Sequence, residues 1–202
     1  AADVNEEALS RFTANYGVTN IYADYRAMLD REHLDIVSVS TGANVRREIV
    51  LGIAQSQAVK AMVIEKPISI DLVQADEMID ACEKAKIRLA INHQRRCDPF
   101  FRRAKRMIDD GAIGELRAIH ASGVHAGFDM TNNGTHLFDS VRMFGGDAEW
   151  VWASVTMDGR DVTGDDLIWG DRKVTSQNEA LAAGNRVSAV FSFKNGVRAF
   201  FE

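Results

Sequence analysis

The sequence contains few cysteines and no long apolar run, and each shortage excludes a class of protein. Only two of its 202 residues are cysteines and only two are prolines. Cys82 and Cys97 fit no spacing used by zinc sites or redox disulfides, so we expect reduced thiols in a cytoplasmic protein. No apolar run approaches the roughly 18 residues that span a bilayer, and no signal peptide is visible. We therefore expect no membrane partner.

Basic residues are not in excess, which argues against a nucleic-acid partner. The formal net charge is −5 at pH 7, whereas nucleic-acid binders usually carry a basic stripe. The most basic stretch, HQRRCDPFFRRAKR at 93–106, is followed at once by Asp109, Asp110 and Glu115. We interpret this stretch as the solvated face of a helix. With 46% hydrophobic and 26% charged residues, the composition is typical of a globular protein.

The first part of the chain alternates between strand and helix patterns. Strands are expected at 35–40, 59–64 and 88–92, and helices between them at 44–55 and 71–86. This order predicts a parallel sheet with right-handed crossovers. At the very start, Ala1-Ala2-Asp3 has the character of a strand end, and a helix capped by Asn5 follows it.

The pattern changes after about residue 95, where Asp98-Pro99 begins a helix. Longer strands and one intervening helix are then expected at 116–124, 134–144 (the helix), 150–158, 185–194 and from 197 onward. Asn195-Gly196 forms a two-residue turn between the last two strands. These features predict an antiparallel sheet with helices on one face, and the polar segment 159–184 is expected to be a long loop.

The expected fold class is therefore α/β. A domain with a parallel sheet at 1–95 is followed by an α+β domain with a mainly antiparallel sheet at 96–202. Both ends of the chain fall inside expected elements, which is typical of a fragment of a longer protein.

Polar residues follow the predicted parallel strands, at the edge where such sheets bind ligands. The strand ends carry Asp3, Ser40-Thr41-Gly42, Glu65-Lys66-Pro67 and Asn92-His93-Gln94. A carboxylate at the position of Asp3 can accept hydrogen bonds from ribose hydroxyls. A charge placed at a helix N-terminus explains Asp3 equally well, and the residues alone leave both interpretations open.

Two residues have the chemistry of an active site. Lys66, between Glu65 and Pro67, follows an apolar strand and can stabilise negative charge that develops on a substrate oxygen. The alternative is a solvated surface ion pair. His136 falls in the first turn of a predicted helix, where the positive helix end favours the neutral imidazole that acts as a base. Asn132 or Asp139 can orient its ring, although a histidine satisfied within the fold is the alternative.

Metal ligands do not stand out in the sequence. His120 and His125 are separated by an odd number of positions on a predicted strand, so we expect them to face opposite sides of the sheet. No zinc or calcium spacing is present, and we expect no metal site.

Four stretches resemble the Gfo/Idh/MocA family of oxidoreductases, which includes glucose–fructose oxidoreductase and inositol 2-dehydrogenase. They are DIVSVST, VIEKPIS, AINHQRRCDPFFRRAKRMIDDGAIGEL and NNGTHLFDSVRMFGG, in the same order and at similar intervals. The resemblance implies an N-terminal Rossmann domain and a second domain whose large sheet often forms a dimer or tetramer interface. It implies NAD or NADP as cofactor, and hydride transfer to or from a secondary alcohol of a sugar, cyclitol or related small molecule.

The same resemblance implies roles for individual residues. Lys66 contacts substrate and cofactor, His136 is the acid/base, and Asp3 is the ribose carboxylate, which favours NAD over NADP. The remaining residues of the strand ends, namely Ser40, Thr41, Glu65, Pro67 and Asn92, are then expected to bind the cofactor. A Gly-x-Gly-x-x-Gly loop is expected just upstream of residue 1.

The chain departs from the family pattern in two places. Asn132 stands where many members carry the aspartate that acts with the histidine. The loop after the first strand commonly reads Thr-Pro-Asn-x-x-His, and here Gly42 and Arg46 replace the proline and the histidine. These departures favour one alternative, a non-catalytic ligand- or partner-binding member. A second alternative within the same family is a redox-neutral glycoside-processing enzyme with tightly held NAD. The substrate itself is not encoded in any spacing.

Overall fold

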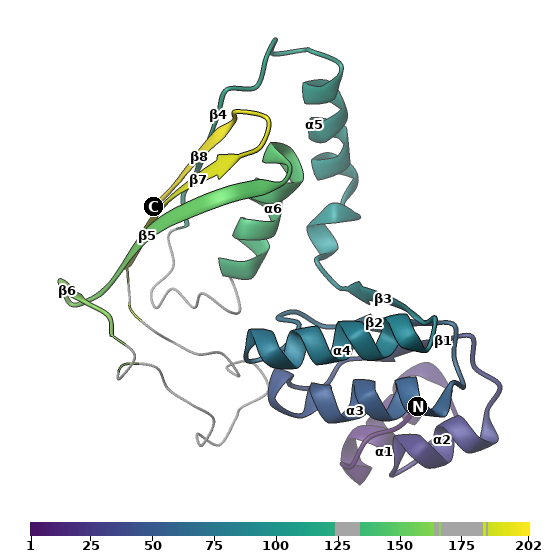
Figure 1. The fold of residues 1–202 in the computed structure, drawn as a ribbon. Coiled ribbons are helices and arrows are strands. Elements are labelled where there is room, and N and C mark those ends of the chain that lie inside the picture. Colours follow the sequence, from purple (N-terminus) through teal and green to yellow (C-terminus); the bar gives the residue numbers. More distant parts are fainter. Residues whose placement is uncertain (124–133, 164–165, 167–183, 185) are drawn as a thin grey trace. The chain divides into compact units, whose positions relative to one another are not determined.

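A computed structural model describes residues 1–123, 134–163, 166, 184 and 186–202. The chain divides into two compact units, Ala1–Ile91 and Asn92–Glu202, and Figure 1 shows the elements of both. Their assignment to a cofactor domain and a substrate domain stays a prediction. Among the helices within these ranges, none combines the length and apolar character of a bilayer span.

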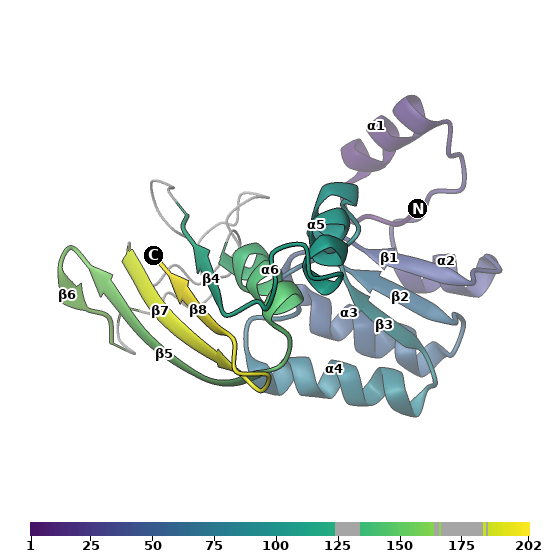
Figure 2. The ribbon, with the colours of Figure 1, turned by 90° about the horizontal axis from the view of Figure 1, so that it is seen from above.

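The first unit contains the predicted parallel sheet. Its strands are β1 (Ile36–Val39), β2 (Ala61–Ile64) and β3 (Arg88–Ile91), which pair in that order. The crossovers are α3 (Ala43–Ser56) and α4 (Leu72–Lys84), and Figure 2 shows both helices on one face of the sheet. Alternate strand residues enter the core between these layers, together with helix residues; the most buried are Val39, Val50, Ile53, Met62, Ile64, Met78 and Cys82.

The second unit is built on the predicted, mainly antiparallel sheet. Its strand order is β4 (Ala118–Ala121), β8 (Arg198–Phe201), β7 (Arg186–Phe193), β5 (Ala148–Met157) and β6 (Arg160–Asp161). Only the β4–β8 pair is parallel among these strands. Helix α6 (Thr135–Gly145) covers one face, where Leu137, Phe138 and Val141 pack against residues of β7 and β8.

Side-chain hydrogen bonds cap the starts of three helices, as the sequence predicts. Asn5 caps α1 (Glu6–Tyr16), and its side chain accepts a bond from the Ala8 amide at 3.1 Å. Asp71 caps α4 through the Gln74 amide at 2.8 Å. Asp98 caps α5 (Pro99–Asp109) through the Phe100 and Phe101 amides. Each carboxylate or amide oxygen satisfies a helix donor that would otherwise lack a partner.

Some elements differ from the prediction. The strand expected at 116–124 is confined to Ala118–Ala121 in the described residues, and Ala2 forms only an isolated parallel bridge with Tyr22. Strand β6 lies inside the segment predicted to be a loop, and most of 164–183 lies outside the described residues. The short helices α2 (Tyr25–Arg31) and η1 (Gln94–Arg96) have no counterpart in the prediction, because elements this short carry little periodicity.

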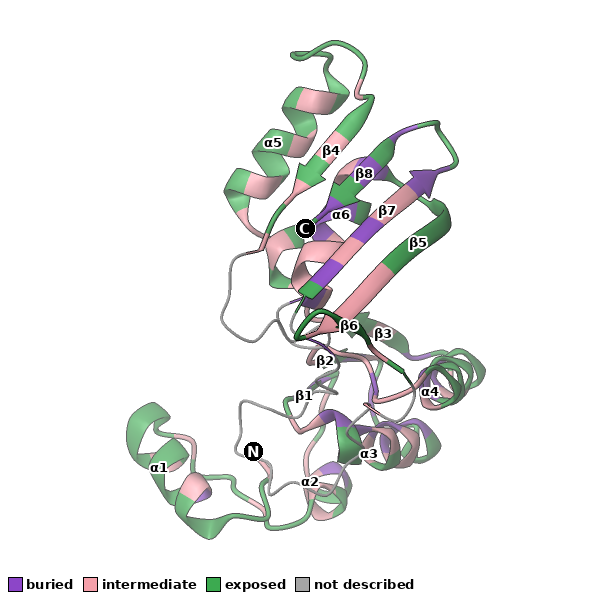
Figure 3. Cartoon of the chain, turned by 90° about the vertical axis from the view of Figure 1, so that its left-hand side faces the viewer, coloured by how far each residue is buried: buried purple, intermediate pink, exposed green. Residues whose placement is uncertain are grey.

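The face of the second sheet opposite α6 carries a row of exposed aromatic side chains. Trp152 lies opposite Val190, Val190 opposite Phe200, and Phe200 beside His120, whose ring stacks on it at 5.1 Å between centroids. Trp152 and Phe200 are 59% and 40% exposed, and Figure 3 shows the first half of β5 as exposed. This aromatic row, defined as Trp152, Phe200 and His120, is an uncovered apolar surface in the described structure.

The end of α6 fits closely against the sheet, and this contact predicts a stability effect. A Cβ atom added at Gly145 would lie 2.7 to 2.9 Å from three ring carbons of Phe193. Phe193 is buried among Val141, Val197 and Ala199, so its ring has no room to move. We expect Gly145→Ala to lower the free energy of unfolding by about 1–3 kcal/mol, measured by urea denaturation.

A double-mutant cycle supplies the control for this prediction. Replacing Phe193 with leucine removes the ring carbons that the new methyl group would meet, so Gly145→Ala should cost less in that background. Equal costs in both backgrounds would show that the Phe193 ring does not restrict this position.

Candidate active site

The register of the parallel sheet brings two of the predicted loops to one edge. Val39 pairs with Ile64, and Ile64 pairs with Ile91, so the three strands end at the same level. The Glu65 amide also donates to the Val39 carbonyl at 3.1 Å. Ser40-Thr41 and Glu65-Lys66-Pro67 therefore leave the sheet side by side, and Asn92 follows β3 as the first residue of the second unit.

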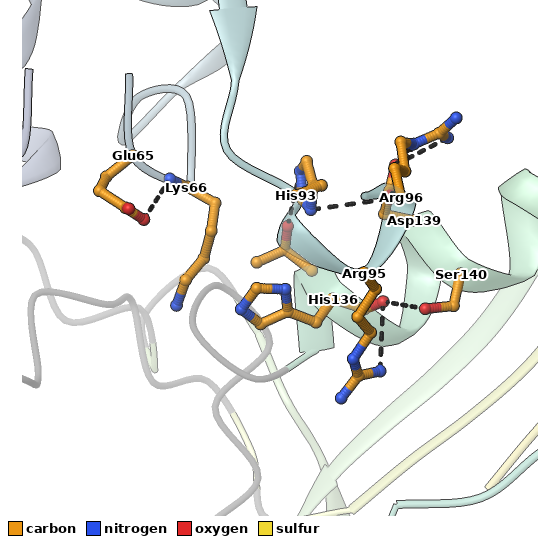
Figure 4. Close-up of polar contacts among 9 residues, drawn as sticks. Glu65, Lys66, His93, Arg95, Arg96, His136, Asp139 and Ser140 are labelled. Atoms are coloured by element: carbon orange, nitrogen blue, oxygen red, sulfur yellow. Dashed lines mark hydrogen bonds and ion pairs between the residues drawn. The ribbon is translucent and has the colours of Figure 1, made fainter. Parts of the chain in front are cut away.

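The Glu65-Lys66-Pro67 turn is half-buried, which argues against a solvated surface ion pair. The Lys66 amide donates to the Glu65 carboxylate at 3.3 Å, and Figure 4 shows the Lys66 side chain extending away from that carboxylate. The peptide bond between Lys66 and Pro67 is cis. The next polar residue, Ser69, is buried and donates to the Asp71 carbonyl, which connects the turn to the start of α4.

A buried arginine joins the two loops. Arg46, on α3, is 2% exposed. Its Nη2 atom donates to the Thr41 carbonyl and its Nη1 atom to the Pro67 carbonyl. Buried charges require such partners, because removal from water is costly. In the sequence this residue is visible only as a departure from a family pattern, because no spacing predicts which carbonyls a side chain will reach.

Asp3 is exposed, and one of its oxygens has a local role. Its Oδ1 atom accepts a hydrogen bond from the Asn5 amide at 2.8 Å, immediately before α1. The Asp3 amide donates to the Tyr22 carbonyl at 3.1 Å. The interpretation of Asp3 as a charge at a helix start therefore has structural support, and its role toward a ribose stays a prediction.

In the second unit, polar side chains gather at the first turn of α6. His136 is the second residue of this helix, and its ring meets that of His93 edge-to-face, with centroids 5.9 Å apart. The Nε2 atom of His93 lies 3.4 Å from Thr135 Oγ1, and its Nδ1 atom lies 3.9 Å from Asp139 Oδ2. Figure 4 shows this group, in which two imidazoles, a hydroxyl and a carboxylate lie together. Sequence reasoning noted His93 only as a polar residue near a strand end.

Charged residues hold this turn in place. Arg96 Nε binds both Asp139 oxygens, at 2.8 and 2.9 Å. The Ser140 hydroxyl donates to the His136 carbonyl at 2.7 Å, and Arg95 Nη1 approaches the same carbonyl at 3.5 Å. Asp139 therefore anchors α6 to the segment that follows β3. Asn132, His125 and Asp129 lie outside the described residues.

Metal-ligating side chains do not cluster in the ranges that the structure describes. Within them, no group of three or more His, Cys, Asp or Glu side chains is placed to hold a metal ion. Cys82 is buried and Cys97 exposed, and neither is in a disulfide. Burial raises the pKa of the Cys82 thiol.

The contact between Asp139 and Arg96 predicts a stability difference between two ion pairs. Asp139→Asn removes a largely buried carboxylate charge from a two-point contact, so we expect a loss of about 1.5–3 kcal/mol in the free energy of unfolding. The matched control is Asp109→Asn, which breaks an exposed pair with Lys105 on α5 and should cost about 0.5 kcal/mol or less. Equal losses in urea denaturation would show that Asp139 does not anchor α6.

Comparison with known proteins places the first unit in a family. Residues 1–93 match the model of the Gfo/Idh/MocA family, described as an oxidoreductase family with an NAD-binding Rossmann fold. The match covers β1, β2 and β3 and both strand-end loops.

Two curated relatives and one solved structure extend the similarity along the chain. D-apiose dehydrogenase from Paraburkholderia graminis is 28% identical over 207 residues, which cover 94% of this chain and 55% of that protein. Myo-inositol 2-dehydrogenase from Thermotoga maritima is 27% identical over 203 residues, which cover 96% of this chain and 57% of that protein. The chain thus spans about half the length of these relatives.

The solved structure shares the fold. An oxidoreductase from Agrobacterium radiobacter, in complex with NAD⁺, L-tartaric acid and magnesium, superposes with a TM-score of 0.75 at 20% identity. The match covers 99% of this chain and 56% of that one. The family resemblance seen in the sequence is confirmed: residues 1–93 match the Gfo/Idh/MocA family of oxidoreductases, and relatives of 27–28% identity extend the similarity over almost the whole chain.

Proposed function

We propose that the protein is an NAD(P)-dependent oxidoreductase, which transfers a hydride between a nicotinamide and a secondary alcohol of a sugar, cyclitol or related small molecule. The shared end of β1 and β2 carries the proposal, because it brings the Thr41 and Lys66 loops to one edge within the segment matched to an NAD-binding fold. The curated relatives are named for D-apiose and myo-inositol, which supports a polyhydroxylated substrate. Cytoplasmic location and the lack of a nucleic-acid partner stay predictions.

The residues at this edge suit a dinucleotide. In the described part of the chain, the buried Thr41 hydroxyl has no hydrogen-bond partner, which a ligand would supply. Lys66 adds a cation, and the exposed Asp3 carboxylate has a second oxygen for ribose hydroxyls. We propose that these three residues contact the cofactor, and that Asp3 favours NAD over NADP. The same proposal extends to the other strand-end residues, Ser40, Glu65, Pro67 and Asn92.

The proposed catalytic residues are Lys66, His136 and Asn132. When bound, the nicotinamide supplies the hydride acceptor. The Lys66 ammonium donates a hydrogen bond to the alcohol oxygen and stabilises the negative charge that develops as the carbonyl forms. His136 removes the hydroxyl proton, and the bonds to its backbone carbonyl hold its helical turn. Asn132, outside the described residues, is proposed to orient the His136 ring.

The exposed aromatic row supports a further proposal, that the protein forms a homo-oligomer through this sheet face. Large exposed apolar patches commonly mark protein–protein contacts. Dimer and tetramer both remain compatible with this surface.

The activity is tested with the full-length protein. We expect reduction of NAD⁺, followed by absorbance, with at least one member of a panel of aldoses and cyclitols. Lys66→Met keeps a side chain of similar length and removes its charge, so turnover should fall by about 10²–10⁴-fold. The control is Lys60→Met, because Lys60 is 85% exposed and pairs with Asp35 at the start of β2, away from the strand ends.

Other outcomes of this experiment separate the alternatives. Absence of NAD⁺ reduction with every substrate would contradict the dehydrogenase proposal. A tightly held cofactor that is retained on gel filtration and shows no net reduction would favour the redox-neutral enzyme. Near-normal turnover of Lys66→Met would remove Lys66 from the mechanism.

The oligomer proposal has its own test. Trp152→Arg places a charge in the aromatic row, so we expect sedimentation equilibrium to show a smaller species than for the unchanged protein. Leu72→Arg is the matched control, because Leu72 is 82% exposed on α4 and lies outside this face. The proposal would be contradicted if Trp152→Arg had the same mass in solution as the protein without substitutions. It would also be contradicted if the protein without substitutions were a monomer.

A further inference from the structure

We infer that Arg46 is a positioning residue that holds the Thr41 loop and the Lys66 turn at a fixed spacing, and so controls cofactor binding and hydride transfer. The inference rests on the proposed function and deepens it, because it concerns how the same edge of the sheet is built. It adds a residue that touches neither the reacting carbon nor the proton.

The placement of Arg46 is unusual for a charged residue. It is the fourth residue of α3, is among the largest fully buried side chains of the described structure, and has a cation near the positive end of its helix. Burial and the helix dipole both disfavour a cation there. A methionine would fill similar space without either cost, so packing alone does not explain an arginine at this position.

The hydrogen bonds of Arg46 show what the cation accomplishes. Its two terminal nitrogens donate to Thr41 and Pro67, whose carbonyls belong to loops that leave neighbouring strands. A planar guanidinium presents several N–H groups in a fixed fork, so one rigid group can set the separation of two acceptors. A lysine ammonium concentrates its donors at one point, and an imidazole is too short to replace the fork.

The two acceptors flank the groups that the proposed function uses. The Thr41 carbonyl belongs to the residue whose hydroxyl is buried at the strand end, and Pro67 directly follows Lys66. Beyond the sheet, a backbone bond from the Glu65 amide to the Val39 carbonyl also joins these strand ends. Loss of the guanidinium would leave two carbonyls without these donors and let the loops separate. Small displacements of this kind are sufficient to impair catalysis.

A purely structural role makes a different prediction. If Arg46 only stabilises the fold, its variants lower the stability of the first unit and leave the folded protein with normal binding and turnover. If Arg46 positions the loops, folded variants bind cofactor weakly and turn over slowly, and the two loops become accessible to solvent. Stability must therefore be measured separately from binding and rate.

The experiment compares Arg46→Lys and Arg46→Met with Val50→Ala in the full-length protein. Val50 is fully buried on the same helix and contacts the core, so its truncation lowers stability without removing a loop contact. Each variant is tested by urea denaturation, by NADH fluorescence titration, by kcat and KM for the alcohol, and by hydrogen exchange at residues 40–42 and 65–69.

We expect Arg46→Lys to weaken NADH binding about tenfold, the equivalent of one lost hydrogen bond, and to lower kcat about 10²-fold. Arg46→Met should lose at least as much, and exchange should accelerate in both loops. Val50→Ala should lose stability, with NADH affinity and loop exchange close to those of the unchanged protein. If an Arg46 variant is unfolded in buffer, the measurements are made in trimethylamine N-oxide, which favours the folded state.

The inference is overturned if folded Arg46→Lys and Arg46→Met bind NADH and turn over normally, or if Val50→Ala reproduces their losses. Failure of the proposed function gives a different result. If the protein without substitutions binds NADH but oxidises no alcohol, the proposed dehydrogenase activity is contradicted. The NADH titration and the hydrogen exchange of the variants still decide the role of Arg46.

Discussion

The shared register of β1, β2 and β3 is the constraint on which the candidate site depends. Parallel strands that start in register end in register, so residues that are far apart in sequence reach one edge together. Short strands make this effective, because each has only four residues and the loops begin at once. A shift of one residue in β2 would turn Met62 and Ile64 out of the core and reverse the direction of Lys66.

Fixed charges then complete what the register begins. In the first unit, the buried guanidinium of Arg46 joins the loops after β1 and β2. In the second, the two-point contact of Arg96 with Asp139 attaches the first turns of α6 to the segment after β3. Both contacts use an arginine, whose planar guanidinium presents its N–H donors in a fixed geometry. Of the proposed catalytic residues that the structure describes, Lys66 thus lies on a short loop and His136 on a helix, and neighbouring charges restrain both elements.

Much of the fold was predictable because its signals are local. The caps Asn5, Asp71 and Asp98 act over two to three residues, and all three occur as predicted. A tight turn between β7 and β8 is also present, but the prediction of two residues is wrong: the Gly196 amide donates to the Phe193 carbonyl, so the loop has three residues and only Gly196 has positive φ. The limits of β4 and the presence of β6 were not predictable, because they depend on partner strands elsewhere in the chain. The same holds for the candidate site. The polar residues at the strand ends could be predicted from the sequence, and their hydrogen-bond partners could not.

The sequence by itself determined the order of strands and helices, the polar residues that follow each parallel strand, and the family pattern around Lys66 and His136. Tertiary structure decided which of these residues are connected. The burial of Arg46 between two carbonyls and the placement of His93 between Thr135 and Asp139 join residues that lie far apart along the chain. Hydrogen-bond partners of this kind follow from three-dimensional packing, because a buried polar side chain bonds to an acceptor that the fold brings near it. The residues next to it in the sequence do not indicate which acceptor that is.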